Sequence, residues 1–336
     1  MAGPRTQIGL FSLVDHLSDP ITGAQTTQGE RLSELVELGV LAEQVGFERF
    51  AVGEHHFSEY ILPNPNLILS AVAARTRRVR LFTTVTLIAL HDPLRLAEDV
   101  AVIDALSGGR VELSVARGVS EETSSAFGID HEDPYGVMGE RLESLLGMLA
   151  THRASTVAGG SLPLSPRPVQ KPHPPIWIGG GLSQGSCDLA AAHGLPLILP
   201  SLFRHPEDYL PMVERYRVEM GVRSPDVAPR LGMPSYCWVA ETSQEARRRF
   251  QPRLEFYIER FKSLRHGFGR PMSFDSLLRG PVICGSPAEV VDRLAHVNEL
   301  LALDTHILLM DLGGVPFGEL RRAVELVGAH VLPQLR

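Results

Sequence analysis

Hydrophobic residues along the chain form short apolar runs that alternate with stretches of helical periodicity. The runs have the length of buried β-strands, and eight are expected at 7–13, 47–52, within 79–90, 110–116, 175–178, 196–199, about 236–240 and 306–311. Apolar residues at helical spacing predict helices at 29–45, 66–75, 93–106, from about 136 to 150, and at 183–193, 206–220, 287–300 and 317–327. Buried strands that alternate with helices predict a parallel sheet.

Eight consecutive strand–helix units favour closure of this sheet into a (β/α)8 TIM barrel, with residues 1–336 forming a single domain. The alternative is an open, doubly wound sheet. That fold usually carries a G-x-G-x-x-G motif, which the glycine cluster at 179–185 does not fit, and no P-loop G-K-[ST] occurs. The stretch 241–280 is rich in arginine and aromatic residues and longer than one crossover requires. We expect it to be a helical insertion over one barrel mouth.

Composition narrows the class of protein further. With 336 residues, 44% of them hydrophobic and 21% charged, the chain can bury a large core and is not disordered. A net charge of −7 argues against a general nucleic-acid binder. No apolar run reaches the roughly 18 residues of a membrane span, and no signal peptide is evident. Three cysteines without paired spacing suit a reducing compartment. We therefore expect a cytoplasmic protein with no nucleic-acid or membrane partner.

The first candidate site follows the second predicted strand, because active sites of such barrels lie where strands end and loops begin. The sequence there is Gly53-Glu54-His55-His56-Phe57. Neighbouring side chains of an extended segment point to opposite sides, so only one histidine can face the mouth while the other packs or bonds backward. Metal-binding spacing such as H-E-x-x-H is absent, so no metal site is expected. The alternative is that both histidines are merely hydrogen-bonded.

Two further candidates follow the fourth and fifth strands. Arg117 stands beside a glycine, an arrangement that suits a phosphate or carboxylate, although a surface ion pair with nearby glutamates would explain it equally well. The glycines at 179–181 lead into a helix with hydroxyls at Ser183 and Ser186, and bare N–H groups at a helix start favour anions. An ordinary loop with a serine cap is the alternative there. These positions together indicate a phosphorylated ligand with a histidine near its reactive end.

Other polar residues rank lower as functional candidates. Asp92 directly precedes Pro93 and is expected to cap the third helix; the alternative is a functional pair with His91. Asp15 and His16 follow the first strand and either touch a substrate or are loop polar groups. No G-x-S-x-G elbow occurs, and no cysteine has a recognised nucleophile setting.

Several motifs, in this order, resemble those of the bacterial luciferase-like flavin monooxygenases. They are GEHHF at 53–57, LHDPLRLAED at 90–99, LSGGR at 106–110, ARG at 116–118, PIWIGGG at 175–181, HGLP at 193–196, GSPAE at 285–289 and VLP at 331–333. The resemblance covers nearly the whole chain, with 241–280 its weakest part.

This resemblance implies a luciferase-like (β/α)8 barrel, usually a homodimer, that binds reduced FMN (FMNH2) supplied by a separate flavin reductase. In the family, O2 adds to carbon 4a of the flavin and the resulting peroxyflavin oxygenates a small organic substrate. Two other readings remain open. One is a hydride-transfer oxidoreductase that uses a deazaflavin coenzyme on the same fold, and the other is a flavin-binding protein without catalytic activity.

By the same resemblance, His55 matches the family's catalytic histidine near the isoalloxazine. The implied flavin-binding residues are Phe11 in the ring pocket, Thr84 and Val85 at a non-prolyl cis peptide under the flavin, and Arg117, Ser183 and Ser186 at the phosphate, with backbone help from Gly181 and Leu182. Arg141 is a candidate for a second phosphate arginine.

The sequence also departs from the luciferases at two positions. Ala116 stands where luciferases carry a reactive cysteine, and Ser201 lies near the place of a tryptophan. Neither long-chain aldehydes as substrates nor light emission is therefore implied.

Overall fold

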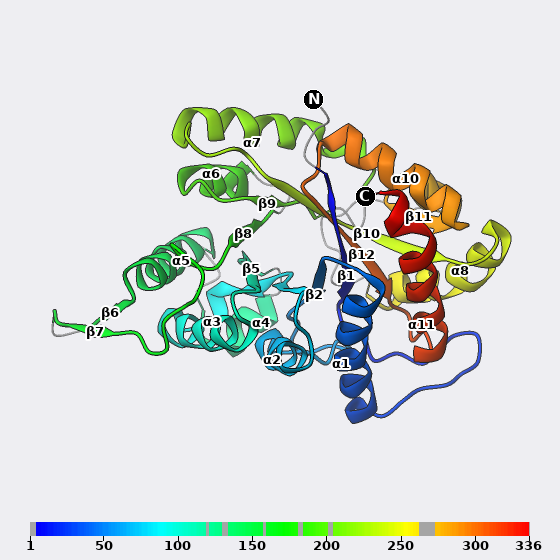
Figure 1. Cartoon of the computed structure of the whole chain (residues 1–336), viewed down its shortest axis with the longest axis horizontal. Helices are drawn as coiled ribbons and strands as arrows, with labels where there is room; N and C mark the ends of the chain where they lie inside the picture. Colours follow the sequence, from blue (N-terminus) through cyan, green and yellow to red (C-terminus); the bar gives the residue numbers. More distant parts are fainter. Residues whose placement is uncertain are drawn as a thin grey trace.

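The computed structural model of the chain (Figure 1) describes residues 5–118, 121–129, 134–156, 159–180, 184–200, 204–261 and 273–335. Its strands are β1 (Gln7–Ser12), β2 (Arg49–Val52), β3 (Arg80–Thr83), β4 (Thr86–Leu87), β5 (Val111–Ala116), β6 (Arg153–Ser155), β7 (Ser161–Pro163), β8 (Ile176–Gly179), β9 (Leu197–Ile198), β10 (Leu231–Val239), β11 (Val282–Gly285) and β12 (Thr305–Asp311). Its α-helices are α1 (Gln28–Val45), α2 (Pro65–Arg75), α3 (Pro93–Ser107), α4 (Glu121–Ala126), α5 (Pro134–Thr151), α6 (Gln184–Ala192), α7 (Leu210–Arg223), α8 (Ser243–Arg260), α9 (Phe274–Arg279), α10 (Pro287–Leu301) and α11 (Phe317–Leu326).

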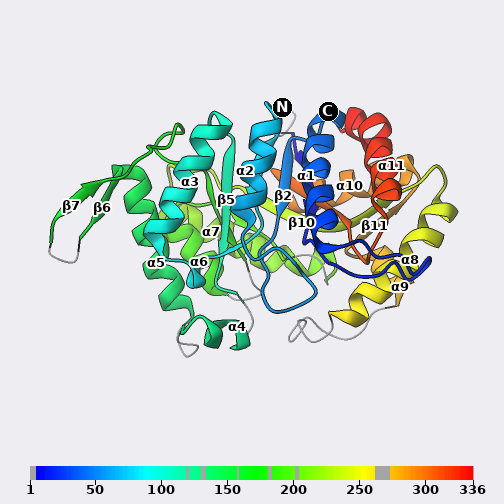
Figure 2. The same ribbon diagram turned by 90° about the horizontal axis from the view of Figure 1, so that it is seen from below.

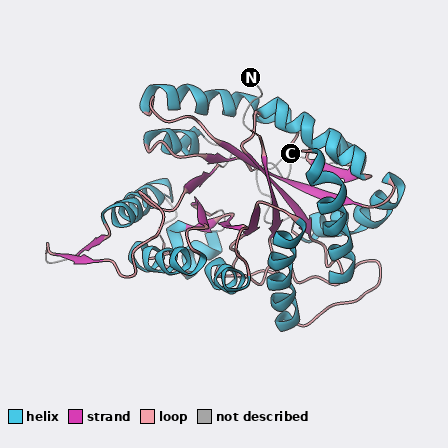
Figure 3. Ribbon diagram, viewed as in Figure 1, coloured by secondary structure: helices cyan, strands magenta, loops and turns pink. Residues whose placement is uncertain are grey.

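Eight parallel strands close into a barrel in the order β1-β2-β3-β5-β8-β9-β10-β12, with β12 pairing back onto β1. Figure 3 shows these strands in the middle of the molecule with helices around them. The closed barrel confirms the predicted (β/α)8 fold and excludes the open, doubly wound sheet.

Two strand pairings were not expected from the sequence. Strand β11 pairs with Tyr236–Val239 of β10, because β9 reaches only the first two residues of β10 and the later backbone groups need another partner. The segment 151–175, in which the sequence predicts no strand or helix before residue 175, contains the antiparallel hairpin β6–β7, which projects away from the barrel in Figures 1 and 2. Both elements consist of strands of three or four residues, too short to show a periodicity.

Local capping explains where the helices around the mouth begin. The Asp92 side chain accepts a hydrogen bond from the backbone N–H of Arg95, and Pro93 occupies the first turn of α3. Gly108 ends this helix with a φ of 69°. Asp92 is therefore a helix cap, as expected, and it fixes the start of α3 directly beside His91.

Buried ion pairs fill the amino end of the barrel. Arg49, in the first position of β2, contacts Glu112 of β5 at 3.2 Å, and the Trp177 indole N–H donates to the same carboxylate at 3.1 Å. Arg49 and Glu112 are both 2% exposed. A ligand would therefore bind at the opposite end, where the strands finish and where α4 lies at the lower edge of Figure 2.

The stretch 241–280, expected to be an insertion, contains α8 and α9 in its described part. Helix α8 lies against the segment that follows β12, since a Cβ on Gly313 would be 2.5 Å from the carbonyl oxygen of Arg253. Among the described residues, no helix has the length and apolar character needed to cross a lipid bilayer.

Candidate functional site

The described site residues lie on neighbouring strands of one half of the barrel. Phe11 belongs to β1, His55 follows β2, Thr84 and Val85 follow β3, and Arg117 follows β5. Ser186 lies in α6, directly after β8. Because β1, β2, β3, β5 and β8 are consecutive in the sheet, these residues form an arc at its carboxyl end. Gly181, Leu182, Ser183 and Ser201 lie outside the described residues.

The peptide bond between Thr84 and Val85 lies at the centre of this arc and is cis, as the sequence resemblance implied. Glycines flank it on both sides. A Cβ on Gly53 would lie 2.9 Å from the Thr84 carbonyl oxygen, and a Cβ on Gly179 would lie 2.7 Å from Val85 Cγ1. The glycines therefore permit the ends of β2 and β8 to approach this peptide closely. Phe11 is 2% exposed and lies within β1.

A buried carboxylate, Glu54, organises the two histidines that surround it. It accepts hydrogen bonds from His56 Nε2 at 2.9 Å, from His91 Nε2 at 2.9 Å and from the Leu87 backbone N–H at 3.0 Å. Burial raises the pKa of this carboxyl, but the hydrogen bonds from His56 and His91 outweigh it and hold the pKa below its usual value. Glu54 is therefore an anion that fixes two imidazole rings.

His55 points into different surroundings from His56, as the extended backbone predicts. Its partly buried ring stacks on Tyr60 with the ring centroids 4.1 Å apart and the planes at 21°. Burial lowers the pKa of His55 to about 4, against the opposing effect of the Glu54 carboxylate. The imidazole is consequently neutral at physiological pH and carries one N–H donor and one acceptor nitrogen.

Arg117 lies over an aromatic ring that also borders the start of α6. Its guanidinium carbon is 4.9 Å from the centroid of the Tyr135 ring. A Cβ on Gly185, in the first turn of α6, would lie 3.4 Å from Tyr135 Cε1. The Arg117 guanidinium and the amino end of α6 therefore both lie beside the Tyr135 ring. Ser186, the residue after Gly185 in α6, is buried. Arg141, a candidate for a second phosphate arginine, instead donates to the carbonyl oxygen of His91.

A second buried ionic cluster lies beside the mouth. Arg31 Nη2 donates to Asp311 at 2.7 Å and lies 3.8 Å from Asp15. Asp15 is 1% exposed and accepts from the Gly314 N–H. Burial raises the pKa of Asp15 to about 7; Arg31 opposes this rise and Asp311 adds to it. Asp15 is therefore a buried, partly protonated group and not an ordinary loop residue.

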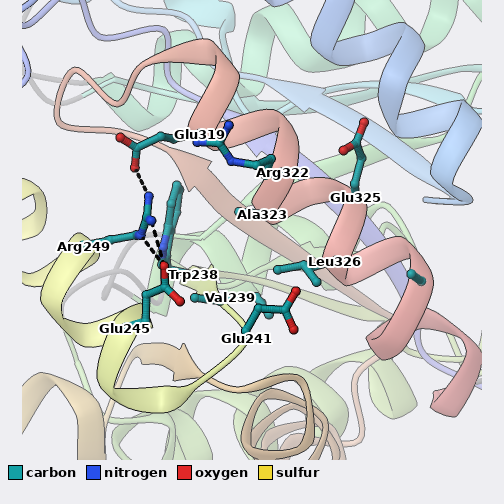
Figure 4. A pocket seen from close by; sticks show the side chains of 12 residues that line it. Trp238, Val239, Glu241, Glu245, Arg249, Glu319, Arg322, Ala323, Glu325 and Leu326 are labelled. Atoms are coloured by element: carbon teal, nitrogen blue, oxygen red, sulfur yellow. Dashed lines mark hydrogen bonds and ion pairs between the residues drawn. The ribbon is translucent and has the colours of Figure 1, made fainter.

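A separate pocket of about 360 Å³ lies between α8 and α11, and Figure 4 shows the side chains that line it. Arg249 pairs there with Glu245 and with Glu319, so these charged groups satisfy one another. None of the expected site residues lines this pocket. The ion pairs of Arg249 therefore anchor α8 to α11, and the pocket supplies no group to the arc around His55.

Three residues of the site were not selected from the sequence. Glu54 stands inside the GEHHF motif, but its importance depends on His91, which lies 37 positions further along. Tyr60 and Tyr135 carry no signal in the sequence, because aromatic residues are also ordinary core residues. Within the described ranges, no three His, Cys, Asp or Glu side chains are grouped as metal ligands would be.

The chain is similar in sequence and in structure to several known monooxygenases. The chain is 23% identical to the oxygenase component of the flavin-dependent trigonelline monooxygenase of Acinetobacter baylyi, over 97% of this chain and 95% of the relative. The monooxygenase RslO1 from Streptomyces bottropensis superimposes with a TM-score of 0.85 at 27% identity, over 98% of this chain and 100% of that one.

A second solved structure is the oxygenating constituent of 3,6-diketocamphane monooxygenase from Pseudomonas putida, in complex with FMN. It has a TM-score of 0.79 at 15% identity, and 98% of each chain is covered. The model of the luciferase-like monooxygenase family matches residues 6–304, which include every strand of the barrel up to the start of β12. The chain therefore belongs to the luciferase-like monooxygenases.

Proposed function

We propose that the protein is the oxygenase component of a two-component flavin monooxygenase, which takes reduced FMN from a separate reductase and uses O2 to oxygenate a small organic substrate. The observation that carries this proposal is the arc formed by His55, the cis peptide Thr84–Val85 and Arg117 at the ends of neighbouring strands. Two similar proteins add support, since one relative is called an oxygenase component and one related structure is a complex with FMN.

The residues present fit FMN at both of its ends. Within the described part of the chain, the buried Thr84 hydroxyl has no hydrogen-bond partner, so it can bond to a polar edge of an isoalloxazine. At the other end of the arc, Arg117 and the first turn of α6 provide a cation and backbone N–H groups for a phosphate. A polar ring edge and an anionic tail are the two features that FMN presents.

Reduced flavin, when bound, supplies the electrons that activate O2, so that one oxygen atom enters the substrate and the other leaves as water. The chain's own residues would bind and orient the cofactor and would accept a proton. Arg117 would hold the phosphate, and the backbone of Thr84–Val85 would support the ring. Burial lowers the pKa of His55 to about 4, so the imidazole is neutral and would offer an unprotonated ring nitrogen as a proton acceptor. The Glu54 carboxylate, next to His55 in the chain, holds His56 and His91 in place through hydrogen bonds.

Two substitutions test this proposal by separating chemistry from binding. His55→Ala should lower turnover by about 10²–10⁴-fold, as expected for loss of an acid–base group, with FMN affinity nearly unchanged. Arg117→Ala should weaken FMN binding by about 10–100-fold, because a charged hydrogen bond is worth about 1.5–3 kcal/mol. Fluorescence titration measures the affinity, and oxygen uptake with product analysis over a substrate panel measures turnover.

The outcomes also separate the alternative functions. Oxidation of a reduced deazaflavin without oxygen uptake would replace the proposal with hydride transfer. FMN binding without turnover on any substrate would indicate a flavin-binding protein without catalysis. Wild-type behaviour of both variants would show that the site lies elsewhere.

A further inference from the structure

Three aromatic rings form a continuous stack that starts at His55. The His55 and Tyr60 centroids are 4.1 Å apart, and the Tyr60 and Phe261 centroids are 4.0 Å apart with their planes at 11°. Tyr60 is 6% exposed and Phe261 4% exposed. Both faces of the Tyr60 ring are therefore covered, one by the imidazole and one by a ring at the end of α8.

Tyr60 is held at its backbone as well as at its hydroxyl. It forms an antiparallel bridge with Asp15, flanked by hydrogen bonds from the His16 N–H to the Glu59 carbonyl at 2.8 Å and from the Ile61 N–H to the Val14 carbonyl at 3.0 Å. Its hydroxyl lies 2.6 Å from the hydroxyl of Tyr257 in α8. Backbone, ring faces and hydroxyl are all fixed, so the Tyr60 ring has little freedom to rotate.

Helix α8, which supplies both contacts, is itself anchored by ion pairs. Arg253 is 1% exposed and reaches Asp19 at 2.9 Å and Glu319 at 3.1 Å. One turn earlier, Arg249 bonds to Glu319 of α11, as Figure 4 shows. The anchored helix gives Tyr257 and Phe261 a fixed position relative to the loop that follows β2.

We propose that Tyr60 is a positioning residue that holds the plane of the His55 imidazole, with α8 bracing it through the Tyr257 hydroxyl and the Phe261 ring. A histidine on a loop samples several rotamers unless its neighbours restrict it. A small misplacement of a reacting group costs up to about 100-fold in rate, so such a brace affects turnover directly. This inference rests on the proposed function, in which His55 moves a proton.

Burial has the largest effect on the His55 pKa, and the Tyr60 ring contributes to this burial because it covers one face of the imidazole. The Glu54 carboxylate favours the protonated imidazole, whereas His56 disfavours it. Tyr60 and Tyr257 are neutral, because burial raises the pKa of each hydroxyl well above its ordinary value. Removing the Tyr60 ring would admit water to the covered face of the imidazole. The His55 pKa should then rise from about 4 toward 6.5.

The experiment compares Tyr60→Leu, which removes the stack, with Tyr60→Phe, which keeps the stack and removes only the hydroxyl bond. Tyr216→Leu is the control, since Tyr216 is also fully buried but lies on α7, where its hydroxyl donates to Leu195. Histidine NMR of the flavin-free protein measures the His55 pKa, with the His55 signal assigned by its absence in His55→Ala. Turnover and FMN affinity are measured in parallel.

We expect Tyr60→Leu to raise the His55 pKa and to lower kcat by about tenfold or more, with FMN affinity within about twofold of wild type. Tyr60→Phe should retain the low pKa and most of the turnover, and Tyr216→Leu should change neither. If Tyr60→Leu does not fold, Phe261→Leu removes only the outer ring, which braces Tyr60, and should lower kcat while Tyr60 still covers the imidazole.

Two results would overturn the inference without touching the proposed function. One is an unchanged His55 pKa and kcat in Tyr60→Leu, or an unchanged kcat in Phe261→Leu if that variant replaces it. The other is an equal loss of kcat in Tyr216→Leu, which would show a general effect on stability. Failure of the proposed function is recognised separately, because His55→Ala would then turn over as wild type does.

Discussion

Replacing Asp15 with asparagine removes a carboxyl group whose burial raises its pKa from 3.8 to about 7. In the folded protein this group lies beside Asp311, which disfavours its ionisation, and near Arg31, which favours it. In the unfolded chain the same carboxyl is surrounded by water and loses its proton near pH 3.8. The difference makes the folding free energy depend on pH.

Whether folding stability rises or falls with pH depends on which state, native or unfolded, holds the proton. Between about pH 4 and pH 7 the native protein keeps a proton that the unfolded chain has lost, so stability falls as the pH rises through this window. Each tenfold difference in proton affinity is worth about 1.4 kcal/mol, so the complete effect is about 4 kcal/mol, of which about 3 kcal/mol falls between about pH 5 and pH 8. Below about pH 4 the contribution of Asp15 is fully present.

Urea unfolding of the flavin-free wild type and of Asp15→Asn, at about pH 5 and about pH 8, measures this term. The wild type should lose about 3 kcal/mol relative to the variant on going from the lower to the higher pH. Asp226→Asn, at an exposed position, is the matched control and should follow the wild type. Parallel curves for wild type and Asp15→Asn would show that this carboxyl ionises as an exposed one does, and would refute the reasoning.

Two further predictions concern the carboxylate network and the oligomeric state. Glu54→Gln replaces an anion that binds both His56 and His91, so we expect a loss of about 1–3 kcal/mol in urea unfolding and a fall in turnover; unchanged values for both would contradict the role given to Glu54. The protein is expected to be a homodimer, and α3 exposes Leu106 at 60%, so Leu106→Glu should yield monomers in analytical ultracentrifugation while Leu162→Glu, equally exposed on the β6–β7 hairpin, stays dimeric. Dimers of both variants would place the interface elsewhere.

The barrel could be predicted from the sequence because its strands are apolar runs and its helices carry local caps. Asp92 shows this well, since both its position before Pro93 and its bond to the Arg95 N–H are local. Strand β11 could not be predicted, because its formation depends on β9 ending early beside β10. A run of four residues acquires its structure from that partner.

The site was only partly predictable, for a related reason. The motifs locate His55 and Arg117, and the cis peptide at Thr84 was implied by resemblance to a family. The environment of His55 is created by contacts between distant parts of the chain. Phe261 reaches the stack from about 200 positions away, so no local pattern could reveal it.

The most direct test of the account is a crystal structure of the protein with FMN. The account predicts the phosphate beside Arg117 and the first turn of α6, and the isoalloxazine over Thr84–Val85 within contact of His55. Density for FMN in the pocket between α8 and α11, or at any site away from this arc, would contradict it.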